Sequence, residues 1–326
     1  MPVIAYSDYH PPWFLRNGHV QSIVPILCRR VNGVEYKRQR LDTPDDDFLD
    51  LDFSLVGADR IAVVSHGLEG SSDRPYVRGM VRALNRSGWD AVAWNFRGCS
   101  GEPNRQLRFY HSGDTADLHT VVSHILAEGH HSLIALIGFS LGGNITLKYL
   151  GERGVTVDPR ITAAVALSVP CDLTTAAVTM SSSCNTVYMK RFLRMLHLKI
   201  QWKMQQFPGA IDDRDFQGIR TFHHFDERYT APMHGFQSAV DYYEKASSLP
   251  FLARISIPTL LVNAADDPFL SPSCYPRDVA RNQANLFLEV PAFGGHVGFM
   301  NWSADGEYWS ERRATEFLRN WVDQRP

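Results

Sequence analysis

A serine between two glycines is the residue whose setting most strongly suggests covalent chemistry. Ser140 lies two positions after Gly138 and two before Gly142, where an apolar run (133–139) meets a helical pattern (141–150). A serine in this G-x-S-x-G spacing, between a strand and a helix, occupies a sharp turn that exposes its hydroxyl. The flanking glycines allow strand and helix to approach closely. The sequence therefore predicts that Ser140 is a nucleophile.

Residues that could serve as acid and base follow Ser140 along the chain. A serine hydroxyl is a weak nucleophile and needs a base, which in turn needs an acid to orient it. Enzymes built on this kind of turn carry the acid and then the histidine after the serine. Asp267 follows a predicted strand, and His296 lies between glycines after the next strand. We therefore expect Asp267 to orient His296, and His296 to take the Ser140 proton.

Two other aspartates are alternatives for the acid. Asp266 directly precedes Asp267, and Asp172 follows an earlier predicted strand. The position of Asp267 directly before Pro268 favours Asp267. An aspartate that is not used would bond the backbone of its own turn.

Two backbone amides are candidates for an oxyanion hole, which attack on a carbonyl requires. The first is the amide of Leu141, the residue after the nucleophile. The second should come from the loop 65–70, which follows an early predicted strand. We expect Leu68 there, because the preceding histidine and glycine bend the chain. His66 is expected to bond within this loop rather than to take part in catalysis.

Arg97 and Cys99 lie on a further loop at the end of a predicted strand. We expect Arg97 to be a structural hydrogen-bond anchor rather than a clamp for a substrate carboxylate. For Cys99 the loop gives no reason to expect unusual reactivity.

Cofactor and metal motifs are missing from the sequence. The histidine pairs 130–131 and 223–224 are adjacent residues, which a helix would point about 100° apart. The zinc motif H-E-x-x-H and the phosphate loop G-x-x-x-x-G-K-[ST] do not occur. We therefore expect neither a cofactor nor a metal.

Composition describes an ordinary globular protein. The 326 residues are 44% hydrophobic and 21% charged, with a net charge of -2, so the balance does not favour nucleic acid as a partner. The five cysteines are scattered and form no C-x-x-C pair, which favours a reducing compartment. The N-terminus lacks a secretory signal pattern, and the apolar runs are too short to cross a bilayer. We expect a cytoplasmic protein.

Strand and helix patterns alternate along most of the chain, which favours a mostly parallel sheet with helices on both faces. Two alternating segments, 34–41 and 48–55, flank a turn cluster and predict an antiparallel pair at the edge of the sheet. Further strands are predicted at 61–65, 89–96, 133–139, 161–169, 259–263 and 286–290. Helices are predicted at 76–87, 114–127, 141–150, 273–281 and 305–321.

Residues 171–250 break this alternation with a mostly helical stretch. We expect them to form an inserted lid over the carboxyl edge of the sheet, where ligands bind in such folds. Residues 1–170 and 251–326 would then form the core domain. In the lid, the segment 187–207 has one apolar face and one basic face. It could pack on the domain, line an acyl pocket or make a peripheral contact with an anionic membrane. The apolar face comprises Met189, Phe192, Leu193, Leu196, Ile200, Met204 and Phe207, and the basic face carries Lys190, Arg194, His197 and Gln201.

These motifs together resemble the YheT-like branch of the α/β-hydrolases, which includes fungal ethyl ester synthase/esterases and animal membrane-anchored lipases. The resemblance covers nearly the whole chain and is weakest in the lid. It rests on the segments 66–72, 95–101, 138–144, 263–268 and 294–299, and on an N-terminal segment, 12–22.

This resemblance implies an α/β-hydrolase fold and a Ser-Asp-His serine hydrolase that acts on small acyl esters without a cofactor. It favours short- to medium-chain acyl groups. The anchor of the animal members is missing from this sequence, so their membrane lipids are not expected as substrates. Acyl transfer, thioester or amide cleavage by the same residues remain alternatives, as does a non-catalytic protein that binds a ligand.

Overall fold

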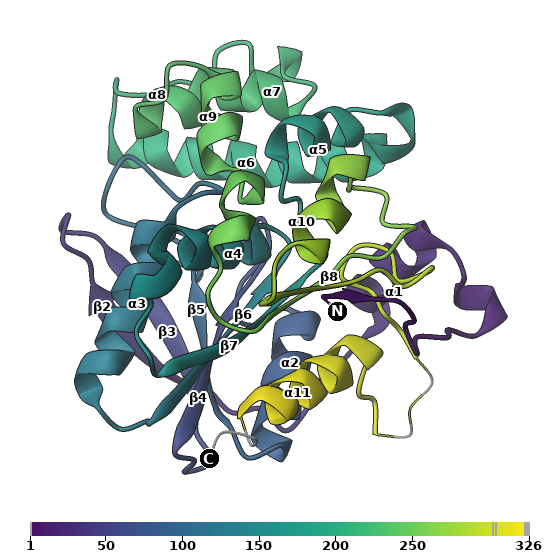
Figure 1. The fold of residues 1–326 in the computed structure, drawn as a ribbon. Helices are drawn as coiled ribbons and strands as arrows, with labels where there is room; N and C mark the ends of the chain where they lie inside the picture. Colours follow the sequence, from purple (N-terminus) through teal and green to yellow (C-terminus); the bar gives the residue numbers. More distant parts are fainter. Residues whose placement is uncertain (1, 302, 304, 323–326) are drawn as a thin grey trace.

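The computed structural model describes residues 2–301, 303 and 305–322, and a nine-stranded sheet forms its centre (Figure 1). The strands are β1 (Val3–Ile4), β2 (Lys37–Asp42), β3 (Phe48–Ser54), β4 (Arg60–Ser65), β5 (Asp90–Asn95), β6 (Leu133–Phe139), β7 (Ile161–Leu167), β8 (Thr259–Val262) and β9 (Leu286–Glu289). Their order is β1-β9-β8-β7-β6-β4-β5-β3-β2. All neighbours pair in parallel except β2 with β3 and β3 with β5. The predicted antiparallel pair at the edge is confirmed.

Helices cover both faces of the sheet, as predicted. Those that pack on it include α2 (Pro75–Arg86), α3 (Thr115–Glu128), α4 (Leu141–Arg153), α10 (Arg277–Arg281) and α11 (Trp309–Val322). Successive strand residues point to opposite faces. In β4, Ile61 and Val63 join a buried cluster with α3 and α4, whereas Ala62 and Val64 join one with α2 and α11. The strand β6, which leads to Ser140, lies between β7 and β4 and is buried along almost its whole length.

The structure adds elements that the sequence patterns did not predict. These are β1, the 3₁₀ turn η1 (Trp13–Leu15), and the helix α1 (Gly18–Cys28), whose first amides are capped by the side chain of Asn17. The segment predicted as a helix at 273–281 is a 3₁₀ turn, η7 (Pro272–Cys274), followed by the short α10.

A group of helices between β7 and β8 lies over the end of the sheet where β6 and β7 finish (Figure 1). Its elements are α5 (Leu173–Met180), η3 (Ser183–Asn185), α6 (Thr186–Gln206), η4 (Phe216–Gly218), α7 (Phe222–Phe225), the π-helical turn η5 (Asp226–Thr230), α8 (Ala231–His234), α9 (Ala239–Ala246) and η6 (Leu249–Arg254). The apolar face of α6 packs inward: Met189, Leu193, Leu196 and Ile200 are buried in one cluster with Phe216. The division into a core domain and a lid remains a prediction.

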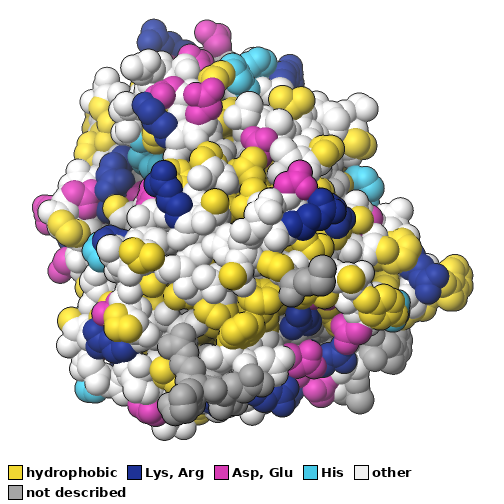
Figure 2. Space-filling view, in the orientation of Figure 1, with side chains coloured by type: hydrophobic (Ala, Val, Ile, Leu, Met, Phe, Trp, Pro, Cys, Tyr) yellow, Lys and Arg dark blue, Asp and Glu magenta, His cyan; other side chains and the backbone are white. Residues whose placement is uncertain are grey.

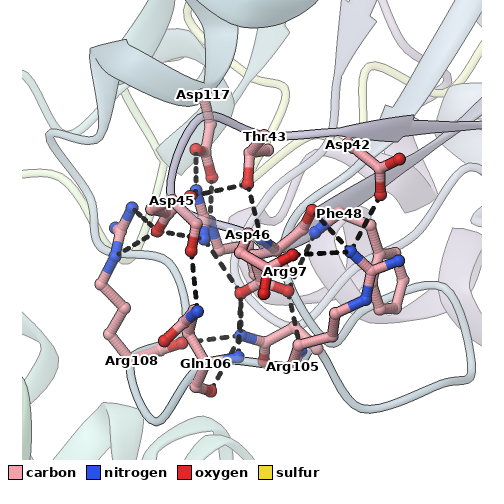
Figure 3. A network of polar contacts seen from close by, with 12 residues as sticks. Asp42, Thr43, Asp45, Asp46, Phe48, Arg97, Arg105, Gln106, Arg108 and Asp117 are labelled. Carbon is pink, nitrogen blue, oxygen red and sulfur yellow. Dashed lines mark hydrogen bonds and ion pairs between the residues drawn. The ribbon is translucent and has the colours of Figure 1, made fainter.

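Arg97 holds the loop after β5 in place (Figure 3). Its guanidinium is almost fully buried and donates to both carboxylate oxygens of Asp117 and of Asp45, and to one of Asp47. Such bidentate, enclosed pairs are geometrically specific. Arg97 is thus a structural anchor, as expected, because its charge is satisfied by three aspartates of the fold.

Candidate active site

The backbone at Ser140 forms the sharp turn that the glycine spacing predicts. Ser140 has φ 52° and ψ -118°, and its amide donates to Leu167 of β7 at 2.8 Å. A Cβ atom at Gly138 would lie 2.4 Å from the Gly142 carbonyl oxygen, and one at Gly142 would lie 2.4 Å from the His66 carbonyl oxygen. The two glycines are therefore required by close approach of the backbone, and Ser140 is held at the head of α4.

Ser140, His296 and Asp267 form one chain of hydrogen bonds. His296 Nε2 lies 2.8 Å from Ser140 Oγ, and His296 Nδ1 lies 2.8 Å and 3.1 Å from the two carboxylate oxygens of Asp267. The Asp267 side chain is fully buried, and one of its oxygens also accepts the amide of Phe269 at 2.9 Å. This arrangement suits a base that takes a serine proton while a fixed anion stabilises its charged form.

The two alternative aspartates lie elsewhere. Asp266 accepts the amide of Gly295 at 2.8 Å, so it bonds the backbone of the histidine loop. Asp172 caps the N-terminus of α5, where it accepts the amide of Thr175. The structure thus brings only Asp267, of the three candidates, to the His296 ring.

The loop after β4 brings Leu68 to the same cavity as Leu141 and Ser140. Among residues 2–301, 303 and 305–322, no group accepts a hydrogen bond from the amides of Leu68 or Leu141. His66 is buried, accepts the amide of Phe96 at 3.1 Å and donates to the Gly67 carbonyl at 2.7 Å. Burial lowers the pKa of His66 to about 3, so it remains neutral and shapes the loop.

A lysine that sequence reasoning missed ties α6 to this loop. Lys199 Nζ donates to Glu69 Oε1 at 2.8 Å and lies 3.1 Å from Cys99 Sγ. The Tyr110 hydroxyl also donates to Glu69 Oε1, at 2.7 Å, and accepts the Glu69 amide at 2.9 Å. Burial raises the pKa of Cys99 to about 11, which keeps it a thiol. No local pattern announces this pair, because its partners are 130 residues apart.

The N-terminal segment that carries part of the family resemblance packs against the histidine loop. The hydroxyl of Ser22 accepts the His296 amide at 2.8 Å, and Gln21 Oε1 accepts the Met300 amide at 2.8 Å. A Cβ at Gly18 would lie 1.9 Å from the Asp266 carbonyl oxygen. The first helix therefore belongs to the framework that positions His296.

A cavity of about 250 Å³ opens above Ser140. Its wall is mostly apolar and includes residues of the helices between β7 and β8 as well as residues of the elements next to the sheet. Among them are Leu141, Leu173, Met180, Phe192, Met195, Phe225 and Phe269. One part of the wall is polar: Asp226 lies there and accepts from Thr230 at 2.5 Å and from Tyr243 at 2.7 Å. Removal from bulk water raises the pKa of Asp226 to about 6.

Within the described part of the chain, no group of three or more His, Cys, Asp or Glu side chains is arranged to hold a metal ion. Among those same residues, no helix combines the length and the apolar character that crossing a membrane demands.

Comparison with known proteins agrees with the fold. Residues 63–301 match the family described as alpha/beta hydrolase fold. The chain is 35% identical to the Escherichia coli (strain K12) protein "Putative esterase YheT", over 97% of this chain and 94% of that one. It is 27% identical to the human "Phospholipase ABHD3" (99% and 81% covered) and 29% identical to the Saccharomyces cerevisiae "Monoacylglycerol lipase" (93% and 68% covered).

Solved structures support the fold. The Pyrococcus furiosus esterase Pf2001 superposes with a TM-score of 0.60 at 19% identity, covering 90% of this chain and 98% of that one. The mostly parallel sheet, the turn at Ser140 and these matches lead to one assignment. The chain belongs to the α/β-hydrolase family, in the branch that contains YheT.

Proposed function

We propose that the protein hydrolyses carboxylic esters through a covalent acyl-enzyme at Ser140. The observation that carries this proposal is the hydrogen-bonded chain from Asp267 through His296 to Ser140, opening into an apolar cavity. Relatives named as an esterase and lipases support ester chemistry in general.

Three side chains and two backbone amides share the steps of this reaction. His296 Nε2 accepts the Ser140 proton as Oγ bonds to the ester carbonyl carbon, and the amides of Leu68 and Leu141 donate to the oxyanion. The carbon–oxygen bond of the ester breaks, and the leaving alkoxide takes the proton from His296. Water then gives a proton to His296 and attacks the acyl carbon. The bond between that carbon and Ser140 Oγ breaks, His296 returns the proton to Oγ, and the acid is released. Asp267 stays ionised throughout and stabilises the imidazolium.

The apolar wall of the cavity supports an acyl group as the part of the substrate that it encloses. Its volume of about 250 Å³ favours a short to medium chain over a long one. Activity should therefore rise with acyl length and then fall once the chain outgrows the cavity.

A series of p-nitrophenyl esters of increasing acyl length, with native and Ser140→Ala protein, tests both points. We expect native activity with an optimum at short or medium length, and loss of activity in Ser140→Ala by at least about 10³-fold. A fluorophosphonate should label the native protein at Ser140 alone. Activity that survives Ser140→Ala, or a native protein that is not labelled, would overturn the proposed nucleophile.

We also propose a reducing, cytoplasmic location. All five cysteines are free thiols, including the buried Cys171 and Cys274. Fractionation of cells shows the location, and lysis in acid followed by alkylation of the unfolded protein counts the free thiols: five alkylated cysteines are expected, and a disulfide would contradict the proposal.

A further inference from the structure

The first 30 residues expose an unusual amount of apolar side chain. Trp13 is 81% exposed and Leu27 74% exposed, and Phe14, Ile23 and Ile26 are also exposed. Figure 2 shows hydrophobic side chains gathered on the protrusion at the right of the view, where Figure 1 places this N-terminal segment. Ile23, Ile26 and Leu27 are spaced three and four residues apart, so they share one face of α1. We call these five residues the docking surface.

The docking surface adjoins the mouth of the Ser140 cavity. Ile26 and Arg191 are both exposed and both line the cavity, so they lie where it opens to solvent. There α1 meets α6: His19 Nδ1 and the Tyr188 hydroxyl are 3.0 Å apart, and their rings stack. One member of the docking surface, Ile26, therefore borders the cavity that contains Ser140.

The two segments that form this mouth are positively charged, although the whole chain has a net charge of -2. Residues 9–34 contain three arginines and no acidic residue, and residues 173–211 contain five lysines and arginines and no acidic residue. Among the described residues, no acidic group pairs with Arg16 or Arg30, which flank α1 in the sequence, or with Arg191 at the cavity mouth. Lys190 and Arg194 line a separate groove beside Phe216. Exposed apolar side chains near cations without acidic partners are complementary to a surface that has an apolar interior and a negatively charged outer layer.

We propose that the docking surface binds the interface of an anionic lipid bilayer, with the cavity mouth facing the lipid. The helix α1 has no charged residue from Gly18 to Cys28 and is too short to cross a bilayer, so it would lie in the plane of the interface. Exposed tryptophan is suited to this depth. The apolar face of α6 is buried in a cluster with Phe216, so α6 contributes Arg191 and α1 contributes the apolar contact.

This binding does not require catalysis, although its use in presenting an ester to Ser140 rests on the proposed function. Sedimentation of Ser140→Ala protein with vesicles therefore tests the docking surface by itself. We expect binding to vesicles of four parts phosphatidylcholine to one part phosphatidylglycerol, at low ionic strength. Binding should weaken at least about tenfold without the anionic lipid or in about 1 M salt, where charges are screened over roughly 3 Å. If the protein does not sediment with the anionic vesicles, the proposal is wrong.

Two variants and a matched control locate the contact. Trp13→Ser with Leu27→Ser should lower vesicle binding at least about tenfold, since both apolar side chains are lost. Leu55→Ser with Val155→Ser removes two other exposed side chains, 57% and 91% exposed. Leu55 lies by the start of β5 and Val155 precedes β7, so both are at the amino ends of the parallel strands, away from the cavity, and binding should be unchanged. The proposal is wrong if the Trp13→Ser, Leu27→Ser variant binds vesicles as native protein does. It is also wrong if the Leu55→Ser, Val155→Ser control loses as much binding as that variant.

The charge contribution has its own test. Arg16→Glu with Arg30→Glu, on either side of α1, should weaken binding to the anionic vesicles at least about tenfold and leave the weak binding to neutral vesicles unchanged. All variants made in the native background should keep hydrolysis of a water-soluble p-nitrophenyl ester. If a fluorophosphonate labels the native protein at Ser140 but the protein does not sediment with vesicles, only the proposed docking surface is wrong. Protein that binds vesicles but is never labelled overturns only the proposed function.

Discussion

Lys199 of α6 forms a buried ion pair with Glu69, the residue that follows the proposed oxyanion donor Leu68. The Nζ–Oε1 distance is 2.8 Å, and the two side chains are only 4% and 9% exposed. Glu69 also has a left-handed backbone conformation, with φ 51°. The helices between β7 and β8 therefore do more than border the cavity. One of them, α6, fixes the loop whose Leu68 amide would donate a hydrogen bond to the oxyanion.

Substituting Lys199→Met should destabilise the fold and slow the reaction of Ser140. The change leaves the Glu69 carboxylate enclosed without its cation, which costs about 3–5 kcal/mol. Urea unfolding should show this loss, and labelling by a fluorophosphonate should slow. Lys190→Met, on the exposed side of the same helix, is the control and should stay within about 0.5 kcal/mol of native protein.

The double variant Lys199→Met with Glu69→Gln separates charge from packing. It removes both charges, so part of the lost stability should return. If the double variant is as unstable as the sum of the two single variants, the ion pair does not couple these residues.

Asp267→Asn should lower kcat by about 10⁴-fold, because an amide cannot hold the imidazole in the tautomer that accepts the Ser140 proton. Asp266→Asn keeps an oxygen for the Gly295 amide and should cost less than about tenfold. Steady-state hydrolysis of one ester by both variants gives the comparison. Similar losses in the two would show that Asp267 is not the orienting acid.

Gly18→Ala tests the contact between α1 and the histidine loop. The new Cβ would lie 1.9 Å from the Asp266 carbonyl oxygen, so one of the two segments must move. We expect a loss of about 1–3 kcal/mol in the free energy of unfolding and at least about a tenfold loss of activity. Gly218→Ala is the control, because nothing lies within 4 Å of its Cβ position. Native activity in Gly18→Ala would contradict a positioning role for α1.

Asp226 should make stability fall as pH rises from about 4 to about 6. Its pKa is about 6 in the fold because the cavity wall shields it from water, against an ordinary value of 3.8. Below pH 4 both the folded and unfolded states hold the proton. Between pH 4 and 6 the unfolded chain releases it first, which costs the folded state up to about 3 kcal/mol.

The Asp226→Asn variant has no group at this position that titrates in this pH range. Urea unfolding at several pH values should therefore show the variant gaining on native protein across that window, with no further gain above pH 6. A difference between the two proteins that does not depend on pH would mean that Asp226 titrates normally.

The residues of the candidate site that sequence reasoning could identify are those with a local pattern. The glycines around Ser140 mark the turn because their missing Cβ atoms permit a close approach, and the glycines around His296 mark a bent loop. Asp267 could be ranked above Asp266 only by its neighbour, and the choice needed three-dimensional geometry. The alternating strands and the apolar face of α6 were predictable because side-chain periodicity follows burial.

The rest depends on contacts between distant segments. Lys199 looks like one more cation on a basic helix until Glu69 is placed opposite it. The helix α1 was missed because exposed apolar residues blur its periodicity and Pro25 interrupts its pattern. Its position beside His296 follows from the packing of the two ends of the chain, which no local spacing encodes.

The bond from the His296 amide to the Ser22 hydroxyl joins residues 274 positions apart. A ribosome has therefore built the whole turn at Ser140, and the strands beside it, long before it adds the loop that carries the base. During synthesis the nascent chain contains Ser140 without its proton acceptor, and α1 without the loop of His296 that it contacts in the folded protein. Reactivity would arise only when the last strand and its loop return to the first helix, so the incomplete chain is chemically silent.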